Sequence, residues 1–152
     1  VAAESLLRRR LKDVVSNYDV CLIDTPPTLG ALTIGALVAA NYVLIPCQSH
    51  SLALAGLAQL LETVDVVRER LNEELKVIGI VPTRVDLRTR HGQEVVEELR
   101  KRFPTETMNT IIRESVRLAE APSFGEPIAV YDPRGSAAAD YRALAAELIG
   151  RL

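Results

Sequence analysis

The sequence predicts an α/β fold with a mostly parallel sheet and helices on both faces. Short, almost wholly apolar segments alternate along the chain with longer segments whose apolar residues recur at helical spacing. Parallel strands need a crossover connection, usually a helix, and strands buried on both faces are apolar throughout. With 152 residues, 48% of them hydrophobic, the chain is long enough for one domain with a sizeable core. We therefore expect a single domain over residues 1–152.

The first two elements are predicted by apolar spacing and by turn residues. In residues 4–15, apolar side chains at helical spacing alternate with basic ones, which predicts an amphipathic helix. Residues 20–23 are apolar and β-branched at both ends, and they stop at Asp24 and two prolines. This run predicts a buried strand.

The remaining elements repeat this alternation. Residues 31–40 are helical in pattern with Asn41 able to end the helix, and residues 42–45 form a strand before Pro46. Further helices are expected at residues 52–71, 93–103 and 137–152, and further strands at residues 77–81 and 110–112. His50 is expected to precede or cap the helix at Leu52. Residues 113–135 are predicted to be the longest irregular region.

Composition and charge limit the function. The 18 basic and 20 acidic residues leave a net charge of −2, so an affinity for DNA or for a membrane surface would need a local basic face. The apolar stretches are broken before the roughly 20 residues of a membrane-spanning helix. Cys21 and Cys47 lie in apolar runs without the spacing of zinc ligands or of a disulfide framework, and we expect both to be buried thiols of a reducing cytoplasm.

Residues 20–24 have the pattern of a Walker B strand. There the apolar residues bury the strand, and the terminal carboxylate reaches a Mg²⁺ ion, often through water. An aspartate that ends a strand also serves as a turn or cap residue. The pattern alone leaves both roles open for Asp24.

Several longer motifs resemble those of ParA/Soj-type partition ATPases, which are P-loop ATPases of the deviant Walker family. Residues 18–30 read YDVCLIDTPPTLG and are similar to the Walker B and switch II segment of that family. Residues 54–60 (LAGLAQL), 116–125 (VRLAEAPSFG) and 131–133 (YDP) follow in the family's order. The resemblance covers essentially the whole chain.

The resemblance implies an ATPase of DNA partitioning and segregation. Such an enzyme uses ATP and Mg²⁺, dimerises with ATP, binds nonspecific DNA of the nucleoid in the cytoplasm, and is stimulated by a ParB-type partner. Asp24 would be the catalytic residue and would hold Mg²⁺ through water. Residues implied at the nucleotide are Thr83, Arg84 and Asp86 on one segment and Ile112, Arg113 and Glu114 on another. Arg88 and Arg117 match arginines that contact DNA in the family.

This sequence departs from the family at two places. The Gly-rich phosphate loop (Walker A) with its lysines is not found, because residues 30–35 (GALTIG) have the glycine spacing but neither the following lysine nor the right place in the chain. Residues 112–115 read IRES where the family often has Ile-Pro-Arg-Asn, so water-facing charged side chains are an alternative to base contacts there.

From these departures we expect the C-terminal part of a longer ATPase, without its phosphate-loop strand and inactive alone. That strand normally lies between residues 20–24 and residues 42–45, so we expect a gap, a rearranged pairing or marginal stability in isolation. Two alternative functions remain. One is a MinD-like membrane-associated relative, against which we expect no membrane contact, and the other is a catalytically inactive module that binds DNA and dimerises.

Overall fold

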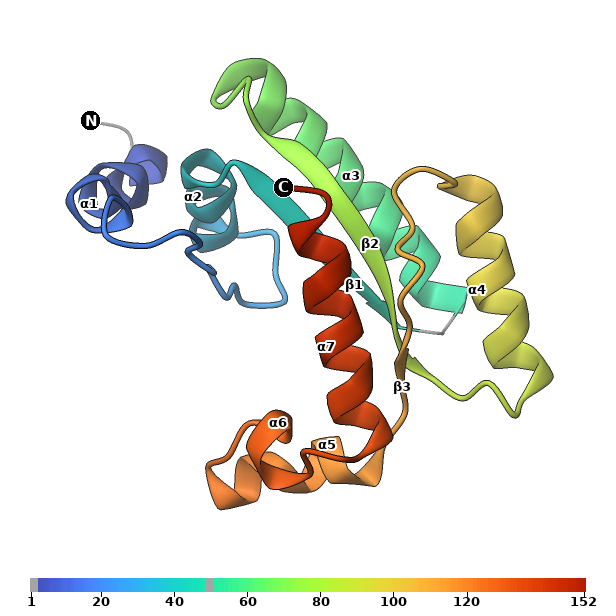
Figure 1. Cartoon of the computed structure of the whole chain (residues 1–152). Helices are drawn as coiled ribbons and strands as arrows, with labels where there is room; N and C mark the ends of the chain where they lie inside the picture. Colours follow the sequence, from blue (N-terminus) through green and yellow to red (C-terminus); the bar gives the residue numbers. More distant parts are fainter. Residues whose placement is uncertain (1–2, 49–50) are drawn as a thin grey trace. The chain divides into compact units, whose positions relative to one another are not determined.

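The computed structural model describes residues 3–48 and 51–152 and confirms the α/β class. Figure 1 shows its helices and strands. His50, which was expected to cap a helix, lies outside the described residues. The helices are α1 (Leu6–Val15, after a 3₁₀ turn at Ala3–Ser5), α2 (Ala31–Ala39), α3 (Ser51–Arg70), α4 (Arg90–Arg102), α5 (Val116–Glu120), α6 (Ile128–Tyr131) and α7 (Ser136–Ile149). The strands are β1 (Tyr42–Gln48), β2 (Lys76–Val85) and β3 (Ile112–Arg113).

The sheet of the described residues has the strand order β1-β2-β3. Strands β2 and β3 are parallel, with Thr83 opposite Ile112 and Val85 opposite Arg113. Strand β1 lies at an edge of this order and runs through Pro46, beyond its predicted end. A proline is tolerated there because an edge strand does not need every N–H for pairing.

The chain divides into two compact units, which are described separately. Unit 1 comprises Val1–Val43 and Leu57–Val77, and unit 2 comprises Leu44–Gly56 and Ile78–Leu152. The core of unit 1 is formed by α2, α3 and Leu75, with Leu37, Val38, Val64 and Val67 buried together. Asn72 is also buried there, and its side-chain amide donates hydrogen bonds to the carbonyls of Leu37 and Ala40 at 2.9 and 2.7 Å. These bonds satisfy acceptors that the last turn of α2 leaves open.

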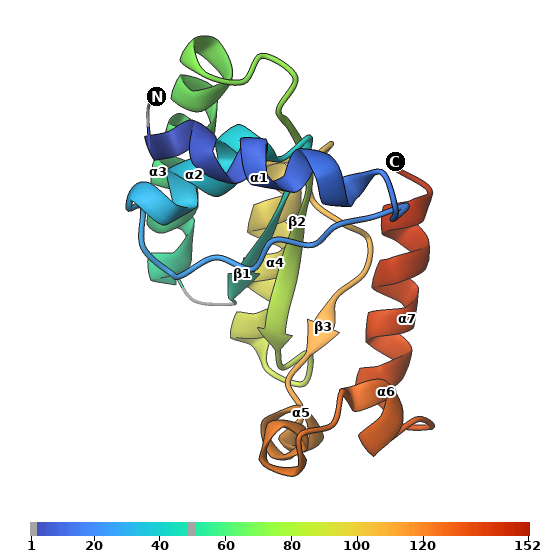
Figure 2. The same ribbon diagram turned by 90° about the vertical axis from the view of Figure 1, so that its left-hand side faces the viewer.

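Unit 2 has two buried clusters, and α7 contributes residues to both. Val81, Met108, Ile112 and Leu144 form one cluster. Ala121, Ile128, Ala137 and Ala138 form the other. Figures 1 and 2 both show α7 running beside β3, the strand that pairs in parallel with β2.

The predicted strand at residues 20–23 is wrong. These residues are extended but form no strand, and they appear in Figure 2 as a loop after α1. Within the described ranges no strand pairs with them, so their apolar character alone cannot create a strand. Val20 and Leu22 are 56% and 90% exposed. Cys21 is exposed as well, against the expectation of a buried thiol, whereas Cys47 is buried as expected and burial raises its pKa.

The prediction that residues 113–135 are irregular is also wrong. It contains α5, a 3₁₀ turn at Ala121–Phe124, and α6. Each is too short to show helical periodicity in the sequence, and each is held by packing on α7 through the buried Ala121 and Ile128.

Candidate functional site

Asp24 lies in the exposed segment that precedes α2, in unit 1. Its side chain reaches solvent, because the strand that would have placed it at a sheet edge does not form. The loop after it is tied to α2 by the Thr33 hydroxyl, which donates to the Thr28 carbonyl at 2.6 Å. Asp24 therefore offers one exposed carboxylate in the segment before α2.

The two segments predicted to meet a nucleotide do come together, in unit 2. The parallel register places Thr83 opposite Ile112 and Val85 opposite Arg113, and the Glu114 N–H donates to the Val85 carbonyl at 3.1 Å. Ligands of open α/β sheets bind at the carboxyl ends of the strands, and this is the carboxyl end of β2 and β3. The two segments that the resemblance implies at the nucleotide therefore lie side by side, although they are far apart in sequence.

Arg84 has an unusual backbone at this edge. Its φ is +52°, in the left-handed region that a residue with a Cβ rarely adopts, and the β2–β3 register shifts at this point. A bulge of this kind redirects a side chain. The Arg84 guanidinium lies 3.4 Å from the Glu114 carboxylate, so the bulge joins the ends of the two strands.

Arg113 on β3 is bound to a carboxylate of α7, that of Asp140. Its guanidinium forms two hydrogen bonds to the Asp140 carboxylate, at 3.0 and 2.7 Å, and its backbone N–H donates to the same carboxylate at 3.1 Å. The Asp140 side chain is 11% exposed, and its hydrogen bonds raise the pKa of Arg113 further. Asp140 was missed from the sequence, where it is one of two acidic residues among the alanines of the last helix.

Arg88 is paired with Asp86 in the turn between β2 and α4. The Arg88 backbone N–H and Nε donate to one carboxylate oxygen at 3.0 and 2.9 Å, and its Nη2 donates to the other at 2.9 Å. The hydrogen bonds from the Arg88 side chain and backbone lower the pKa of Asp86 to about 2. The pair is therefore ionised at any physiological pH.

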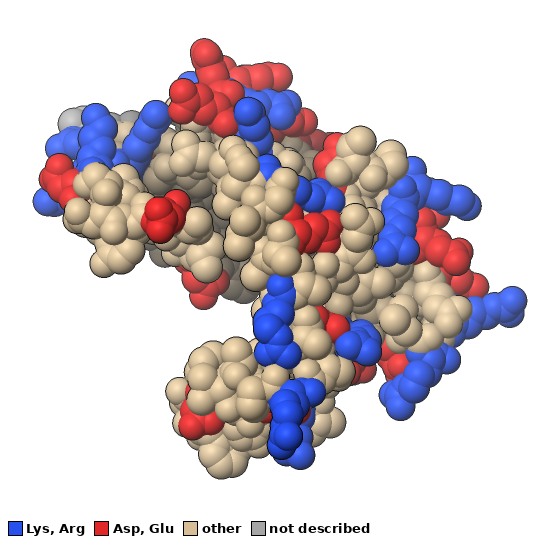
Figure 3. All heavy atoms as spheres, in the orientation of Figure 1, with Lys and Arg blue, Asp and Glu red and all other residues tan. Residues whose placement is uncertain are grey.

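Arg117 also has an acidic partner within its own helix. It donates to Glu120 at 3.1 Å, and the Tyr131 hydroxyl donates to the same carboxylate oxygen at 3.1 Å. Tyr131 in turn stacks on Phe124, with the ring centroids 5.1 Å apart. On the face drawn in Figure 3, basic and acidic side chains are intermixed around α4 and do not form one continuous basic surface.

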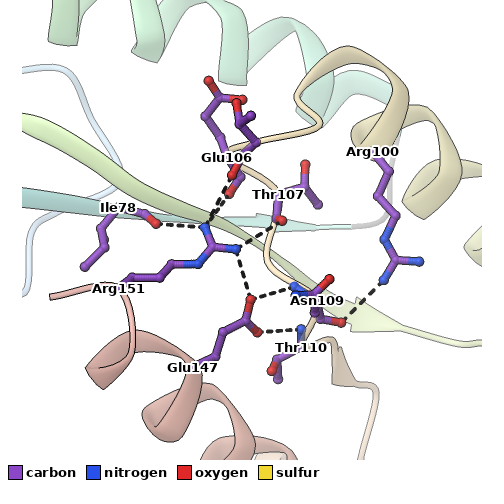
Figure 4. A network of polar contacts seen from close by, with 9 residues as sticks. Ile78, Arg100, Glu106, Thr107, Asn109, Thr110, Glu147 and Arg151 are labelled. Carbon is purple, nitrogen blue, oxygen red and sulfur yellow. Dashed lines mark hydrogen bonds and ion pairs between the residues drawn. The ribbon is translucent and has the colours of Figure 1, made fainter.

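A second polar network, which the sequence did not reveal, holds the segment leading into β3. Glu147 on α7 accepts hydrogen bonds from the backbone N–H groups of Asn109 and Thr110, both at 2.8 Å. Arg151 lies beside it at 3.0 Å and donates to the Ile78 carbonyl on β2 at 3.0 Å (Figure 4). The network fixes the approach to β3 and hence the edge where Thr83 and Ile112 meet.

ATP and Mg²⁺, which the resemblance implies, do not find a complete site in the part of the chain that the structure describes. No group of three or more His, Cys, Asp or Glu side chains is arranged there to hold a metal ion. Phosphates are usually held by backbone N–H groups of a glycine-rich loop and by a lysine. The lysines of this chain, Lys12, Lys76 and Lys101, lie on α1, β2 and α4. We therefore derive no phosphate chemistry from the described residues.

Comparison with known proteins gives consistent relatives. A profile of the AAA domain family matches residues 1–77. The sporulation initiation inhibitor protein Soj of Bacillus subtilis (strain 168) is 47% identical over 148 residues, which cover 97% of this chain and 58% of that protein. The chromosome partitioning protein ParA of Myxococcus xanthus (strain DK1622) is 45% identical over 148 residues, 97% of this chain and 52% of that protein. The chain spans a little more than half the length of these relatives.

The fold is also similar to that of a solved enzyme. Cobyrinic acid a,c-diamide synthase from Mycobacterium smegmatis matches with a TM-score of 0.79 at 31% identity, over 96% of this chain and 53% of that one. The same enzyme was crystallised with a bound ATP analogue and magnesium, and that structure matches with a TM-score of 0.70 at 35% identity, over 76% of this chain and 46% of that one.

Among the helices described here, none is both long and apolar enough to cross a membrane.

Proposed function

This chain belongs to the AAA domain family of Soj/ParA-type partition ATPases, and on this premise we propose that it is part of an ATPase that segregates DNA. In this proposal the complete enzyme works with ATP and Mg²⁺, as a dimer at the nucleoid in the cytoplasm. Nonspecific DNA and a ParB-type protein are its partners. The activity belongs to the longer protein, because this chain spans little more than half of its relatives.

The meeting of β2 and β3 at their carboxyl ends carries the proposal. Two segments that are far apart in sequence, at Thr83–Asp86 and Ile112–Glu114, form one edge there. We propose that Thr83, Arg84, Asp86 and Glu114 lie along the base of the nucleotide. Ile112 would take part only through its backbone, because its side chain is buried in the core cluster of unit 2. Arg113 on β3 ties this edge to α7 through Asp140, and its side chain is not available to the nucleotide while it is bound there.

Arg88 and Arg117 are proposed to contact DNA phosphates. Both side chains are mostly exposed, and both lie in unit 2. The aromatic rings described near Arg117, those of Tyr131 and Phe124, stack on each other. The proposed role of both arginines is to bind phosphates and not bases. Contacts of this kind position DNA without reading its sequence.

Salt-titrated DNA binding tests the proposal. In the full-length protein with ATP, Arg88→Ala or Arg117→Ala should weaken binding to all DNA sequences alike and flatten the slope of log affinity against log salt by up to about one unit for each contact removed. Arg102→Ala is the matched control, because Arg102 is an exposed, ion-paired arginine at the other end of α4. Slopes equal to those of the control for both variants would remove the two arginines from the proposed DNA surface.

A further inference from the structure

The Asp86 carboxylate accepts hydrogen bonds from the guanidinium nitrogen atoms of Arg88 that would otherwise bind a phosphate. The guanidinium presents its Nε and Nη2 to the carboxylate at 2.9 Å each, one to each oxygen. This two-pronged geometry is the one with which arginine also binds phosphate oxygens. A phosphate and the Asp86 carboxylate therefore compete for the same donors.

The carboxylate is the fixed member of this pair. Asp86 directly follows β2, and its backbone carbonyl accepts hydrogen bonds from the Thr89 N–H at 3.1 Å and the Thr89 hydroxyl at 2.8 Å. Gly92 in the first turn of α4 lies so close to that carbonyl that a Cβ there would collide with it. The side chain of Asp86 is 26% exposed and that of Arg88 is 91% exposed. The arginine can thus swing away while the aspartate stays.

We propose that Asp86 is an internal counter-ion that competes with DNA phosphates for Arg88 and so limits what Arg88 adds to DNA binding. The inference rests on the proposed function, in which Arg88 is a DNA contact. The carboxylate stays charged under all physiological conditions, because its pKa is about 2, so the competition is always present. Arg117 meets a weaker competitor, since Glu120 accepts a single bond from it and shares the same oxygen with Tyr131.

Neutralising Asp86 tests the competition. In the full-length protein with saturating ATP and Mg²⁺, Asp86→Asn should tighten binding to a nonspecific DNA duplex about twofold to fivefold, the range in which exposed ion pairs act. The slope of log affinity against log salt should steepen by less than about 0.9, because Arg88 then makes in full the phosphate contact that Asp86 weakens in the wild type. Glu94→Gln is the matched control, because it removes one negative charge on α4 from a looser pair with Arg90 at 3.7 Å. An equal gain in Glu94→Gln would reduce the effect to general charge and overturn the proposal.

A double-mutant cycle separates this inference from the proposed function. Arg88→Ala should weaken binding more in the Asp86→Asn background than in the wild type, and Asp86→Asn should have no effect once Arg88 is gone. If Arg88→Ala has no effect in either background, Arg88 is not a DNA contact and the proposed function fails at this residue. If Arg88→Ala weakens binding equally in both backgrounds, Arg88 binds DNA but the competition is overturned.

One further measurement and one further variant keep the test decisive, because Asp86 is also proposed to lie at the nucleotide. Binding of a fluorescent ATP analogue to each variant shows whether the nucleotide site is saturated in the DNA assay. Should Asp86→Asn fail to fold, Arg88→Lys replaces the fork by a point charge, which cannot bind the carboxylate in two-pronged fashion. DNA binding at least as tight as in the wild type is then expected, and binding as weak as in Arg88→Ala would overturn the proposal.

Discussion

The arginines near the carboxyl ends of β2 and β3 all face carboxylates of the same chain. Arg84 meets Glu114 and Arg113 meets Asp140, across 30 and 27 residues of sequence. Arg88 and Arg117 meet acidic residues two and three positions away. A basic residue type in a motif therefore does not by itself make a positive surface, and the binding strength of each arginine depends on how easily its own partner gives way.

At the same scale, Asp24 is a testable single position. In the full-length protein, Asp24→Ala should lower ATP turnover at least tenfold, in the range by which single catalytic groups contribute, while the fold is retained. Asp19→Ala is the control, because Asp19 is an exposed carboxylate in the same segment. Turnover and Mg²⁺ dependence equal to those of the wild type would mean that Asp24 is only a turn residue.

At the scale of elements, α7 organises unit 2 through its polar residues as much as through its apolar face. Asp140 holds the end of β3 through Arg113, and Glu147 holds the segment before β3. Burial alone would raise the pKa of Glu147, but hydrogen bonds from Thr110 and Asn109 and the nearby charge of Arg151 outweigh it and lower the pKa below that of an ordinary glutamate. The charged form of Glu147 is thus the form that stabilises this unit.

Glu147→Gln should lower the free energy of unfolding at pH 7 by about 1–3 kcal/mol, the usual worth of hydrogen bonds to a charged group. Because the folded pKa is lowered, the contribution is complete above the unfolded value of about 4.3 and is lost as the pH falls through the folded pKa. Urea unfolding at pH 7 and at pH 3 measures the difference, with Glu126→Gln as an exposed control in the same unit. A gap between wild type and variant that stays constant down to pH 3 would contradict this account.

The elements also show what sequence can predict. The helices with several turns of apolar periodicity, α1, α2, α3, α4 and α7, appear within a few residues of their predicted bounds, as do β1 and β2. Helices α5 and α6 were missed because four or five residues carry no periodicity, and packing on α7 forms them. Residues 20–23 have the apolarity of a strand, but a strand exists only with a partner, which local sequence does not specify.

The same limit applies to the candidate site. The resemblance implied two separate segments at the nucleotide, and the parallel register of β2 and β3 brings their ends together. The pairing of Arg113 with Asp140 and the network of Glu147 with Arg151 depend on how α7 packs, so they could not be read from neighbouring residues. Sequence therefore named the residues of the candidate site, and tertiary packing decides which of their charges are paired within the chain.

At the scale of the whole molecule, residues 20–24 are an apolar segment that does not pair with the described sheet. Residues 20–24 expose large side chains and are not hydrogen-bonded into the sheet. Exposed apolar groups with unpaired backbone favour association with any edge that can pair with them. The 152-residue chain on its own should therefore be marginally stable, and a cooperative transition with a high midpoint as a monomer would count against this expectation.

Amide hydrogen exchange on that isolated chain locates the weakness. The N–H groups of residues 20–24 should exchange nearly as fast as in an unfolded peptide, because the structure gives them no ladder of hydrogen bonds. The N–H groups of Ile80 and Met108 are the internal reference, since both donate at 2.8 Å between β2 and the segment before β3 and should be protected. In the full-length protein, residues 20–24 should become protected if another strand pairs with them. Protection of these residues already in the isolated chain would show that they pair within it, as their apolar pattern had suggested.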